Sequence, residues 1–497
     1  MLKKFDRKSF ANPYANRDLD QLGEELAELQ RECVQEKVPV LITIDGWESS
    51  GKGKVLNHVV RLLDAKHYRV NRLVEAKAEE KRLFTLPYWS HLPAYGDFGI
   101  FNRSLYDQLF QNVKMSAKQL KDCLQMIEET EKLLAGDHMI QVKYFLHLTK
   151  EEQKQRMEEL ADDPAASFLV SKEDLVQQDK YKEAYQHINE ILNATNFSFA
   201  PWTIVAAKDT ELCSKFILSD IIDKLGKQLK QIKEDRAKEA EAKFSFQAKK
   251  KLKDFDLSGR VDKKEYEKEL LALQEEAGDL AYELYKAKIP TVLAFEGIDA
   301  AGKGGSIQRL LRNIDARLYH INPTSAPNDA EKDHHYLWRF YNNIPDPGEI
   351  AIFDRSWYGR VMVERIEKFA RPGEWMRAYE EMNTMEKQLT DHDSIVLKFL
   401  LLISKKEQKK RFKDREKEKP YKITEEDWRN RKKWKDYLIA MEDMVELTDR
   451  ENAPWILISS EQKKYARLEV LKAFIRAGKK ALANKKAVRQ GSRTTDL

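Results

Sequence analysis

Short apolar runs alternate along this chain with longer segments whose apolar residues recur at helical spacing. The run at residues 291–295 is typical of a buried strand, and the apolar positions of 307–314 that follow it have the spacing of one helix face. Residues 18–36 and 264–286 form further amphipathic helical patterns, each leading into a strand. Because strands that alternate with helices form parallel βαβ units, the pattern predicts an α/β fold in three α/β/α layers. Further strands are predicted at residues 38–44, 98–101, 144–148, 202–206, 349–353 and 396–403.

The pattern occurs twice, in two halves of similar length. Residues 37–53, KVPVLITIDGWESSGKG, match residues 288–304, KIPTVLAFEGIDAAGKG, about 250 residues further along the chain. Shorter matches at a similar separation include FNRS at 101–104 with FDRS at 353–356. This separation indicates a duplicated domain and not a short-period repeat. We predict a first copy over residues 1–235, a charged helical linker over 236–249 within a Lys-, Glu- and Ala-rich stretch (222–253), a second copy over 250–484 and a disordered tail over 485–497.

The composition is that of a charged protein with real hydrophobic cores. Hydrophobic residues make up 42% of the 497 positions and charged residues 34%. The net charge is only +5, which does not call for a nucleic-acid partner. No apolar run approaches the roughly 18 residues that span a membrane, and the N-terminus has no apolar signal core. We therefore expect no membrane association. Because Cys33, Cys123 and Cys213 form no C-x-x-C pair, we expect free thiols in a reducing cytoplasm.

A glycine-rich loop carries the first candidate chemistry. The pattern Gly297-x4-Gly302-Lys303 stands between the strand at 291–295 and the helix at 307–314. In that context glycines let backbone N–H groups converge on a phosphate, while the helix N-terminus and the lysine add positive charge. Gly304 replaces the usual Ser or Thr that helps to hold Mg²⁺, so Asp299 is the obvious substitute ligand. An ordinary glycine-rich turn is the alternative, and the duplication weakens it.

The next candidates follow the strand at 349–353. Asp354 stands at its C-terminal end, where phosphotransferases place a second metal ligand, and two hard carboxylates suit Mg²⁺. Arg355 and Arg360 are placed to reach phosphate oxygens. A strand-end cap for Asp354 and a surface ion pair for Arg360 are the alternatives.

A strongly charged segment, residues 405–422, follows the strand at 396–403. As a helix it places Arg411 and Arg415 on one face. A solvated charged helix and a mobile lid over an active site both fit this pattern, and the position after a core strand favours the lid.

With these residues assembled, the sequence resembles the polyphosphate kinase type 2 family over nearly its whole length, in two copies. That family phosphorylates nucleotides with inorganic polyphosphate and Mg²⁺, and its tandem-domain members resemble the class that converts AMP to ADP. The resemblance implies two P-loop kinase-like three-layer α/β/α domains with parallel sheets and a helical lid. The matching motifs are EGIDAAGKGG at 296–305, HYLWR at 335–339, FDRSWYGR at 353–360, KITEEDW at 422–428, APW at 453–455 and KKYAR at 463–467.

The resemblance also implies roles for individual residues of the second copy. Asp299 and Asp354 are expected to hold Mg²⁺ and, with Lys303 and Arg355, to form the catalytic set. Direct in-line attack of an AMP phosphate oxygen on the terminal phosphoryl group would then need positioning and charge neutralisation more than covalent chemistry. Phosphate or nucleotide binding is expected of Gly297, Gly302, Gly304, Gly305, Arg339, Arg360, Arg411, Arg415, Lys422 and Lys463.

The first copy departs from this pattern. Asn102 stands where the second copy has Asp354, Glu48 replaces Asp299, and Pro87 stands opposite Arg339, although Lys52 survives. We therefore expect the first copy to be inactive and to serve packing or substrate channelling. The tandem arrangement leaves a homodimer possible where single-domain relatives form tetramers.

Three other functions remain open on sequence alone. The acceptor could be ADP, giving ATP. An ATP-dependent small-molecule kinase of the thymidylate kinase type is a second alternative, but its loop normally keeps the Ser or Thr that is missing here. A non-catalytic polyphosphate- or nucleotide-binding scaffold is the third, and the set Asp299, Lys303, Asp354 and Arg355 argues against it.

Overall fold

The computed structural model describes residues 1–5, 13–73 and 83–493, except for the side chains of Lys422 and of residues 488–493. The chain divides into two compact units. The first takes in the described residues up to Lys238, except Leu83, together with Asn328–Trp338, and the second takes in most of the chain from Glu239 onward. The division falls close to residue 235, where we predicted the first copy to end.

Each unit is built on a five-stranded parallel sheet, and the two sheets have the same topology. The strand orders are β2-β3-β1-β4-β5 and β7-β8-β6-β9-β10, so equivalent strands take equivalent places. The α/β class and the duplicated architecture predicted from the sequence are therefore confirmed. The strands of the first sheet are Val40–Gly46, Tyr68–Asn71, Phe98–Asn102, Ile140–His147 and Trp202–Ala206 (β1–β5), and those of the second are Thr291–Glu296, Tyr319–Pro323, Ile350–Asp354, Ile395–Leu402 and Trp455–Ser459 (β6–β10).

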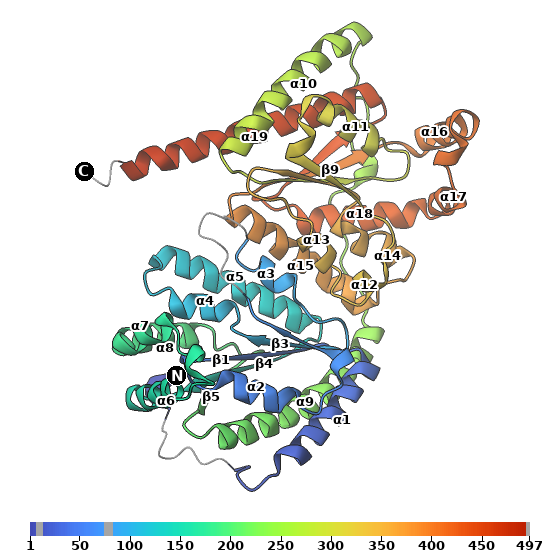
Figure 1. The fold of residues 1–497 in the computed structure, drawn as a ribbon. Coiled ribbons are helices and arrows are strands. Elements are labelled where there is room, and N and C mark those ends of the chain that lie inside the picture. The colour runs from blue at the N-terminus through green and yellow to red at the C-terminus, as the bar shows by residue number, and fades with distance from the viewer. Residues whose placement is uncertain (6–12, 74–82, 494–497) are drawn as a thin grey trace. The chain divides into compact units, whose positions relative to one another are not determined.

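Helices cover both faces of each sheet (Figure 1). In the first half they are α1 (Leu19–Glu36), α2 (Lys52–Val60), α3 (Leu86–Trp89), α4 (Leu105–Gln111), α5 (Ala117–Gly136), α6 (Lys150–Asp162), α7 (Lys172–Asp179), α8 (Tyr181–Ala194) and α9 (Thr210–Glu241). In the second half they are α10 (Lys263–Lys286), α11 (Lys303–Leu310), α12 (Asp329–Lys332), α13 (Trp338–Tyr341), α14 (Val363–Ile366), α15 (Pro372–Asp391), α16 (Lys405–Glu418), α17 (Glu425–Lys432), α18 (Trp434–Thr448) and α19 (Lys463–Arg493), with the short 3-10 helices η7 (Trp357–Val361) and η8 (Pro420–Lys422).

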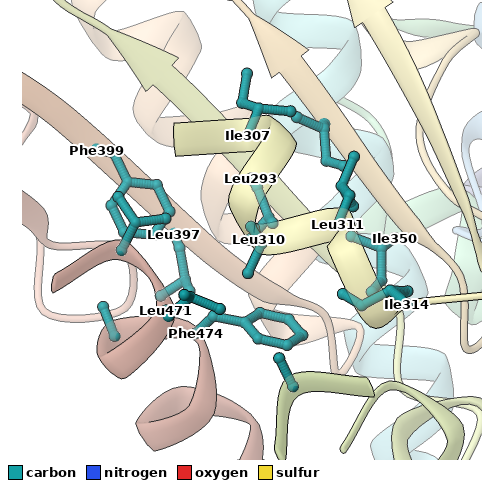
Figure 2. Packing of buried hydrophobic residues seen from close by; sticks show 14 of the residues in the cluster. Leu293, Ile307, Leu310, Leu311, Ile314, Ile350, Leu397, Phe399, Leu471 and Phe474 are labelled. Atoms are coloured by element: carbon teal, nitrogen blue, oxygen red, sulfur yellow. The ribbon is translucent and has the colours of Figure 1, made fainter. Parts of the chain in front are cut away.

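The hydrophobic core of the second unit explains why the helix after the glycine-rich loop is held firmly. Ile307 and Leu310 of α11 lie in one buried cluster with Leu293 of β6 and Leu471 and Phe474 of α19 (Figure 2). Alternate residues of β9 join this cluster, since successive side chains of a strand point to opposite faces. The loop is therefore mounted between a buried central strand and a packed helix.

The sequence pattern did not reveal three edge strands, β2 of the first sheet and β7 and β10 of the second. β2 and β7 are short, and their outward residues Val70 and Ile321 are 43% and 45% exposed. Edge strands contact a single neighbour, so they need no continuous apolar run. This is why the continuous apolar runs that predicted the central strands are absent from β2 and β7.

The predicted linker and tail differ from the structure. α9 runs without a break from Thr210 to Glu241, and its residues Leu225, Leu229 and Ile232 are buried, so the first part of the charged stretch is a packed helix of the first unit. The chain is helical in the predicted linker only as far as Glu241. The predicted disordered tail is wrong up to Arg493, where α19 ends, and residues 494–497 lie outside the described part.

The structure also bears on the cysteines and on possible membrane-spanning helices. Cys33, Cys123 and Cys213 are all free thiols. Burial raises the pKa of both the Cys33 and the Cys213 thiol to about 12, so these groups stay protonated and unreactive at neutral pH. Among the described residues, none of the helices combines the length and the apolar character that crossing a membrane requires.

Candidate functional site

The glycine-rich loop connects β6 to α11 in the second unit. Gly297 and Gly302 have φ values of +139° and +111°, which side chains rarely allow. A Cβ atom on Gly297 would also lie 2.5 Å from the carbonyl oxygen of Leu401, so only glycine fits there. Lys303 begins α11, and its Nζ donates a hydrogen bond of 2.6 Å to the carbonyl of Gly297, which folds the lysine back over the loop.

The neighbouring strand β8 brings Asp354 to the same edge of the sheet. Phe295 of β6 pairs with Asp354 in the parallel register, so the loop and this carboxylate leave adjacent strands side by side. A Cβ built on Gly304 would lie 3.8 Å from Oδ2 of Asp354. The carboxyl ends of parallel strands are where α/β folds bind ligands, and the predicted acid lies there.

Asp299, within the loop, is held from two sides. Its Oδ1 accepts a hydrogen bond of 3.1 Å from Nη2 of Arg355, and its Oδ2 accepts one of 3.0 Å from Nδ2 of Asn430. Burial opposes the charge of Arg355, but the combined attraction of Asp299, Glu296 and Asp354 raises the pKa of the guanidinium. The predicted residues Asp299, Asp354 and Arg355 therefore form one charged group at the mouth of the loop.

Glu296 fixes the turn that carries Arg355. It is fully buried, and its Oε1 accepts hydrogen bonds from both the backbone N–H and the hydroxyl of Ser356, at 2.7 and 2.8 Å. Burial raises the pKa of this carboxyl, although Lys303 and Ser356 favour its charged form. Because the contact joins the end of β6 to the turn after β8, it holds the two candidate segments in one geometry.

The glycine-rich loop, Asp354 and Arg355 line an open cavity of about 1020 Å³. Ten of the predicted site residues are among those that line it: Asp299, Gly302, Lys303, Gly304, Gly305, Asp354, Arg355, Arg411, Arg415 and Lys463. Gly297 lines a second, adjoining hollow. The sequence therefore predicted most of the positions that folding brings together here.

Arg411 reaches the cavity wall in an unexpected way. Its Nε pairs with Glu407 at 2.8 Å, while Nη1 donates to the carbonyls of Ala300 and Ala301 and Nη2 to those of Ser460 and Glu461. The whole guanidinium is thus engaged with the protein, and it clamps the loop to the end of β10. Arg156 makes the equivalent contacts in the first copy, donating to the carbonyls of Ser50, Ala207 and Lys208. Since that copy lacks Asp299 and Asp354, which we call the acidic pair, the clamp serves the shape of the loop.

Besides Gly297, three predicted residues are absent from the described lining of the cavity. Arg339 donates to the carbonyl of Ser325 at 3.2 Å and does not belong to the described lining. Arg360 pairs with Glu364 at 2.9 Å, one helical turn away, as the alternative of an ion pair anticipated. The side chain of Lys422 lies outside the described part of the structure. The phosphate-binding roles of these three residues therefore remain predictions.

The cavity also contains residues that we did not select from the sequence. Arg467 follows Lys463 by one helical turn of α19, and a Cβ on Gly305 would lie 3.5 Å from its Nη2. Helical spacing alone would have placed it on the same face as Lys463. The pKa of Lys463 is lowered by burial and then by the positive charges of Arg411, Arg415 and Arg467, which indicates a crowded basic surface. Other basic lining residues that were not predicted are Arg309 and Lys419.

The equivalent loop of the first copy lines an open cavity of about 920 Å³, but its lysine is paired with an acidic residue of the same loop. Nζ of Lys52 donates to the carbonyls of Gly46 and Trp47 and lies 3.7 Å from the carboxylate of Glu48. Glu48 also accepts a hydrogen bond of 3.1 Å from Arg103. The lysine charge is therefore neutralised within the loop, and Asn102 supplies no carboxylate at the end of β3.

The family to which the chain belongs follows from comparison with known sequences. The sequence model described as polyphosphate kinase 2 (PPK2) matches residues 11–233 and, a second time, residues 260–486. The chain belongs to the polyphosphate kinase 2 family. Each of the two matches covers one of the two copies, so the duplication seen in the sheets is a duplication of the whole PPK2 unit.

Known relatives match more than nine tenths of the chain. A protein of Pseudomonas aeruginosa named polyphosphate:AMP phosphotransferase is 37% identical over 465 residues, which cover 91% of this chain and 93% of that protein. A protein of the same name from Pseudomonas syringae pv. tomato is 36% identical over 94% of this chain and 96% of its own length. A crystal structure described as a polyphosphate kinase 2 from Pseudomonas aeruginosa PA01 superposes with a TM-score of 0.79 at 34% identity, covering 94% of this chain and 95% of that one.

Proposed function

We propose that the second copy transfers the terminal phosphoryl group of inorganic polyphosphate to AMP, giving ADP and a polyphosphate shorter by one unit. The observation that carries the proposal is the cavity at the carboxyl end of β6 and β8, where Asp299 and Asp354 face Lys303 and Arg355. The basic residues around it suit a polyanion longer than a nucleotide phosphate. Relatives named for this reaction match nearly the whole chain.

The reaction needs no covalent intermediate with the protein. A phosphate oxygen of AMP attacks the terminal phosphorus of the polyphosphate, and the bridging oxygen leaves with the remaining chain, so one phosphoanhydride bond forms as another breaks. Lys303 and the amides of the loop hold the transferred group, while Arg355 neutralises charge that builds on its oxygens. Arg415, Lys463 and Arg467 hold the length of the polyphosphate chain.

The residues present fit a magnesium ion bound partly by substrate. Within residues 1–5, 13–73 and 83–493, no group of three or more His, Cys, Asp or Glu side chains could hold a metal ion. Magnesium nevertheless binds commonly through one or two carboxylates together with substrate phosphates and water. Asp299 and Asp354 would supply those carboxylates, and the ion would neutralise phosphate charge. In this proposal the segment from α16 to α17 is the lid that brings Arg415 and Asn430 to the cavity.

The first copy has no part in the chemistry in this proposal. Its lysine is held by its own loop, and both positions of the acidic pair are changed, to Glu48 and Asn102. It is a structural copy whose fold is retained and whose reaction is lost.

The test is turnover with long-chain polyphosphate and Mg²⁺, offering AMP and ADP as separate acceptors and following products by chromatography. Formation of ADP from AMP, with much slower formation of ATP from ADP, is the expected result. Faster use of ADP would replace the acceptor in the proposal. No transfer to any nucleotide, with ATP also inactive as a donor, would overturn the proposal in favour of a binding scaffold.

A further inference from the structure

The chain that joins the two copies packs against the second unit. Residues 239–252, which we call the strap, comprise the last residues of α9 and the irregular chain that follows. The backbone N–H of Leu252 donates to Glu442 of α18 at 3.0 Å, and Lys250 pairs with Asp449, just after α18, at 2.8 Å. The strap is therefore attached to the second unit at its C-terminal end.

Phe244 connects the middle of the strap to α14 and α15. Its ring lies edge-on to Trp375 of α15, at 4.8 Å between centroids and 70° between planes. The guanidinium of Arg365, in α14, lies over both rings, 5.0 Å from the centroid of Phe244 and 4.4 Å from that of Trp375. Because a cation is attracted to the faces of aromatic rings, the strap helps to hold this arginine.

Arg365 is also held by α15 and α18. Its Nη1 donates to the hydroxyl of Tyr379 at 2.9 Å and to the buried carboxylate of Asp443 at 2.8 Å. α14 is only four residues long, and so short a helix is not stable without tertiary contacts. The position of α14 therefore depends on the contacts of Arg365, including the contact with the strap.

The residue that follows α14 contacts the lid. The Glu367 carboxylate, which is 11% exposed, pairs with Nζ of Lys433 at 2.9 Å and lies 4.0 Å from Nε of Arg429. Arg429 belongs to α17, and Lys433 is the residue that caps its C-terminal end. Glu367 thus ties the C-terminal end of α17 to α14, and we call this contact the tether.

Another face of α17 points to the candidate site. Asn430, the residue after Arg429, donates to the carboxylate of Asp299 at 3.0 Å. Thr424, Glu426 and Asp427 line the same cavity. A movement of α17 away from Glu367 would therefore also disturb the contact that orients Asp299, and small displacements of this kind are costly in catalysis.

The first copy lacks the tether. α7 is the equivalent of α17, since each follows a capping box, and Val176 is its fifth residue as Arg429 is the fifth of α17. The turn between α4 and α5, residues 112–116, contains no Asp or Glu. The arginine clamp on the loop, by contrast, occurs in both copies. A contact found only in the copy with the acidic pair is better explained by the reaction than by the fold.

We propose that Glu367 is a positioning residue for phosphoryl transfer, holding α17 where Asn430 orients Asp299, and that the strap supports it by fixing Arg365 of α14. The proposal rests on the function proposed above and names the residues that position the lid of the same site. It makes the linker between the copies a working part of the second copy.

The first experiment measures the lid itself, by hydrogen–deuterium exchange of the full-length protein without substrates. We expect the amides of residues 425–433 to exchange at least about threefold faster in Glu367→Gln than in the wild type. Lys433→Met should have the same effect, and the double variant should add little, because both changes remove one contact. Phe369→Ala, which changes a neighbouring side chain that is 73% exposed, is the control and should match the wild type. Unchanged exchange in Glu367→Gln would overturn the proposal.

The second experiment separates rate from affinity. Lys463 and Arg467, which are proposed to hold polyphosphate, belong to α19 and do not depend on the tether. In Glu367→Gln we therefore expect kcat to fall about fivefold or more, while the KM for polyphosphate changes by less than about twofold. The melting temperature should stay within about 2 °C of the wild type, because the contact lies near the surface. A higher KM with an unchanged kcat would contradict the positioning role.

The third experiment tests the strap. Phe244→Leu keeps an apolar contact with Trp375 but removes the ring from the guanidinium of Arg365. The control is Phe246→Leu, since the Phe246 ring also belongs to the strap and lies 6.0 Å from that of Phe244. We expect faster exchange at residues 425–433 and a lower kcat in Phe244→Leu, and smaller changes in the control. Wild-type exchange and kcat in Phe244→Leu would remove the strap from the proposal.

The exchange measurement needs no turnover, so the tether and the reaction can fail separately. If the wild-type protein transfers no phosphoryl group but Glu367→Gln loosens residues 425–433, the tether stands and the proposed reaction fails. If AMP is phosphorylated and Glu367→Gln matches the wild type in both exchange and kcat, the reaction stands and the tether fails.

Discussion

Lys398 and Glu386 form an ion pair of 2.7 Å in which the two side chains are only 0% and 1% exposed. The ammonium also donates to the hydroxyl of Tyr358 at 3.0 Å and to the carbonyl of Thr448 at 2.6 Å. The pair therefore ties β9 and α15 to η7, the turn that follows Asp354 and Arg355. The first copy repeats the arrangement with Lys143, Glu131 and Tyr106, although it lacks the acidic pair of the candidate site.

Because the network is kept in both copies, we predict that it serves stability. Lys398→Met leaves the Glu386 carboxylate buried without its counter-ion and should lower the free energy of unfolding of the second unit by about 3–5 kcal/mol. Lys143→Met should do the same to the first unit. Denaturant unfolding of both variants measures the effect, and Lys398→Met with Glu386→Leu should recover part of it. A variant that keeps wild-type stability but loses turnover would show a catalytic role instead.

The acidic pair yields a prediction with a matched control in the same chain. Asp354→Asn reproduces the residue that the first copy has at position 102, and it removes a carboxylate proposed to hold Mg²⁺. Turnover should fall on the order of 100-fold or more, with little change in melting temperature. Asn102→Asp should leave turnover as it is, because Lys52 remains held by Glu48 and the loop carbonyls. Retention of most activity by Asp354→Asn would remove this residue from the mechanism.

Arg411 and Arg415 lie on the same helix but should behave differently when changed. Arg411→Lys keeps the charge but cannot hold four carbonyls and Glu407, so we expect a loss of about 3 kcal/mol in the free energy of unfolding. Arg156→Lys should destabilise the first copy similarly. Arg415→Ala should instead raise the KM for polyphosphate several-fold, more at low salt than at high salt, without a change in melting temperature. Equal effects of the two variants on KM, with no loss of stability, would contradict the clamp.

The lowered pKa of Lys463 gives a pH dependence for polyphosphate binding. Its ordinary value is 10.5, and burial with three neighbouring guanidinium groups lowers it, so the ammonium loses its proton at a lower pH than a typical lysine. The charged form exists below the pKa, and polyphosphate affinity should therefore decline as the pH rises toward 10.5. Lys463→Arg keeps its charge throughout this range and should flatten the profile. Measuring the KM for polyphosphate from neutral to alkaline pH in both proteins tests the assignment, and identical profiles would refute it.

The sequence predicted the parts of the fold that depend on burial. The central strands and leading helices were recovered because a strand covered on both faces is a continuous apolar run and a packed helix has an apolar stripe. The edge strands β2 and β7 lack that signal because much of their surface is exposed. The charged stretch at 222–253 was interpreted as a solvated helical linker because its abundant Lys and Glu obscured Leu225, Leu229 and Ile232, which are buried.

The sequence likewise revealed only some of the residues of the candidate site. Asp299, Lys303 and Asp354 stand in local motifs, so sequence spacing was enough to find them. The clamp formed by Arg411 depends on carbonyl groups about 110 residues earlier in the chain and about 50 residues later, and carbonyls belong to every residue type. Asn430 carries no motif, and its hydrogen bond to Asp299 appears only when folding brings the two residues together.

The clamp on the glycine-rich loop has a consequence for how substrate binding energy is used. Arg411 draws the carbonyls of Ala300 and Ala301 toward those of Ser460 and Glu461 before any phosphate arrives. Ordering the loop is thus completed when the chain folds, and the substrate loses little affinity to the conformational entropy of its own binding site. Contacts with the long polyanion can then favour the transition state over the bound ground state, which raises kcat and not only affinity.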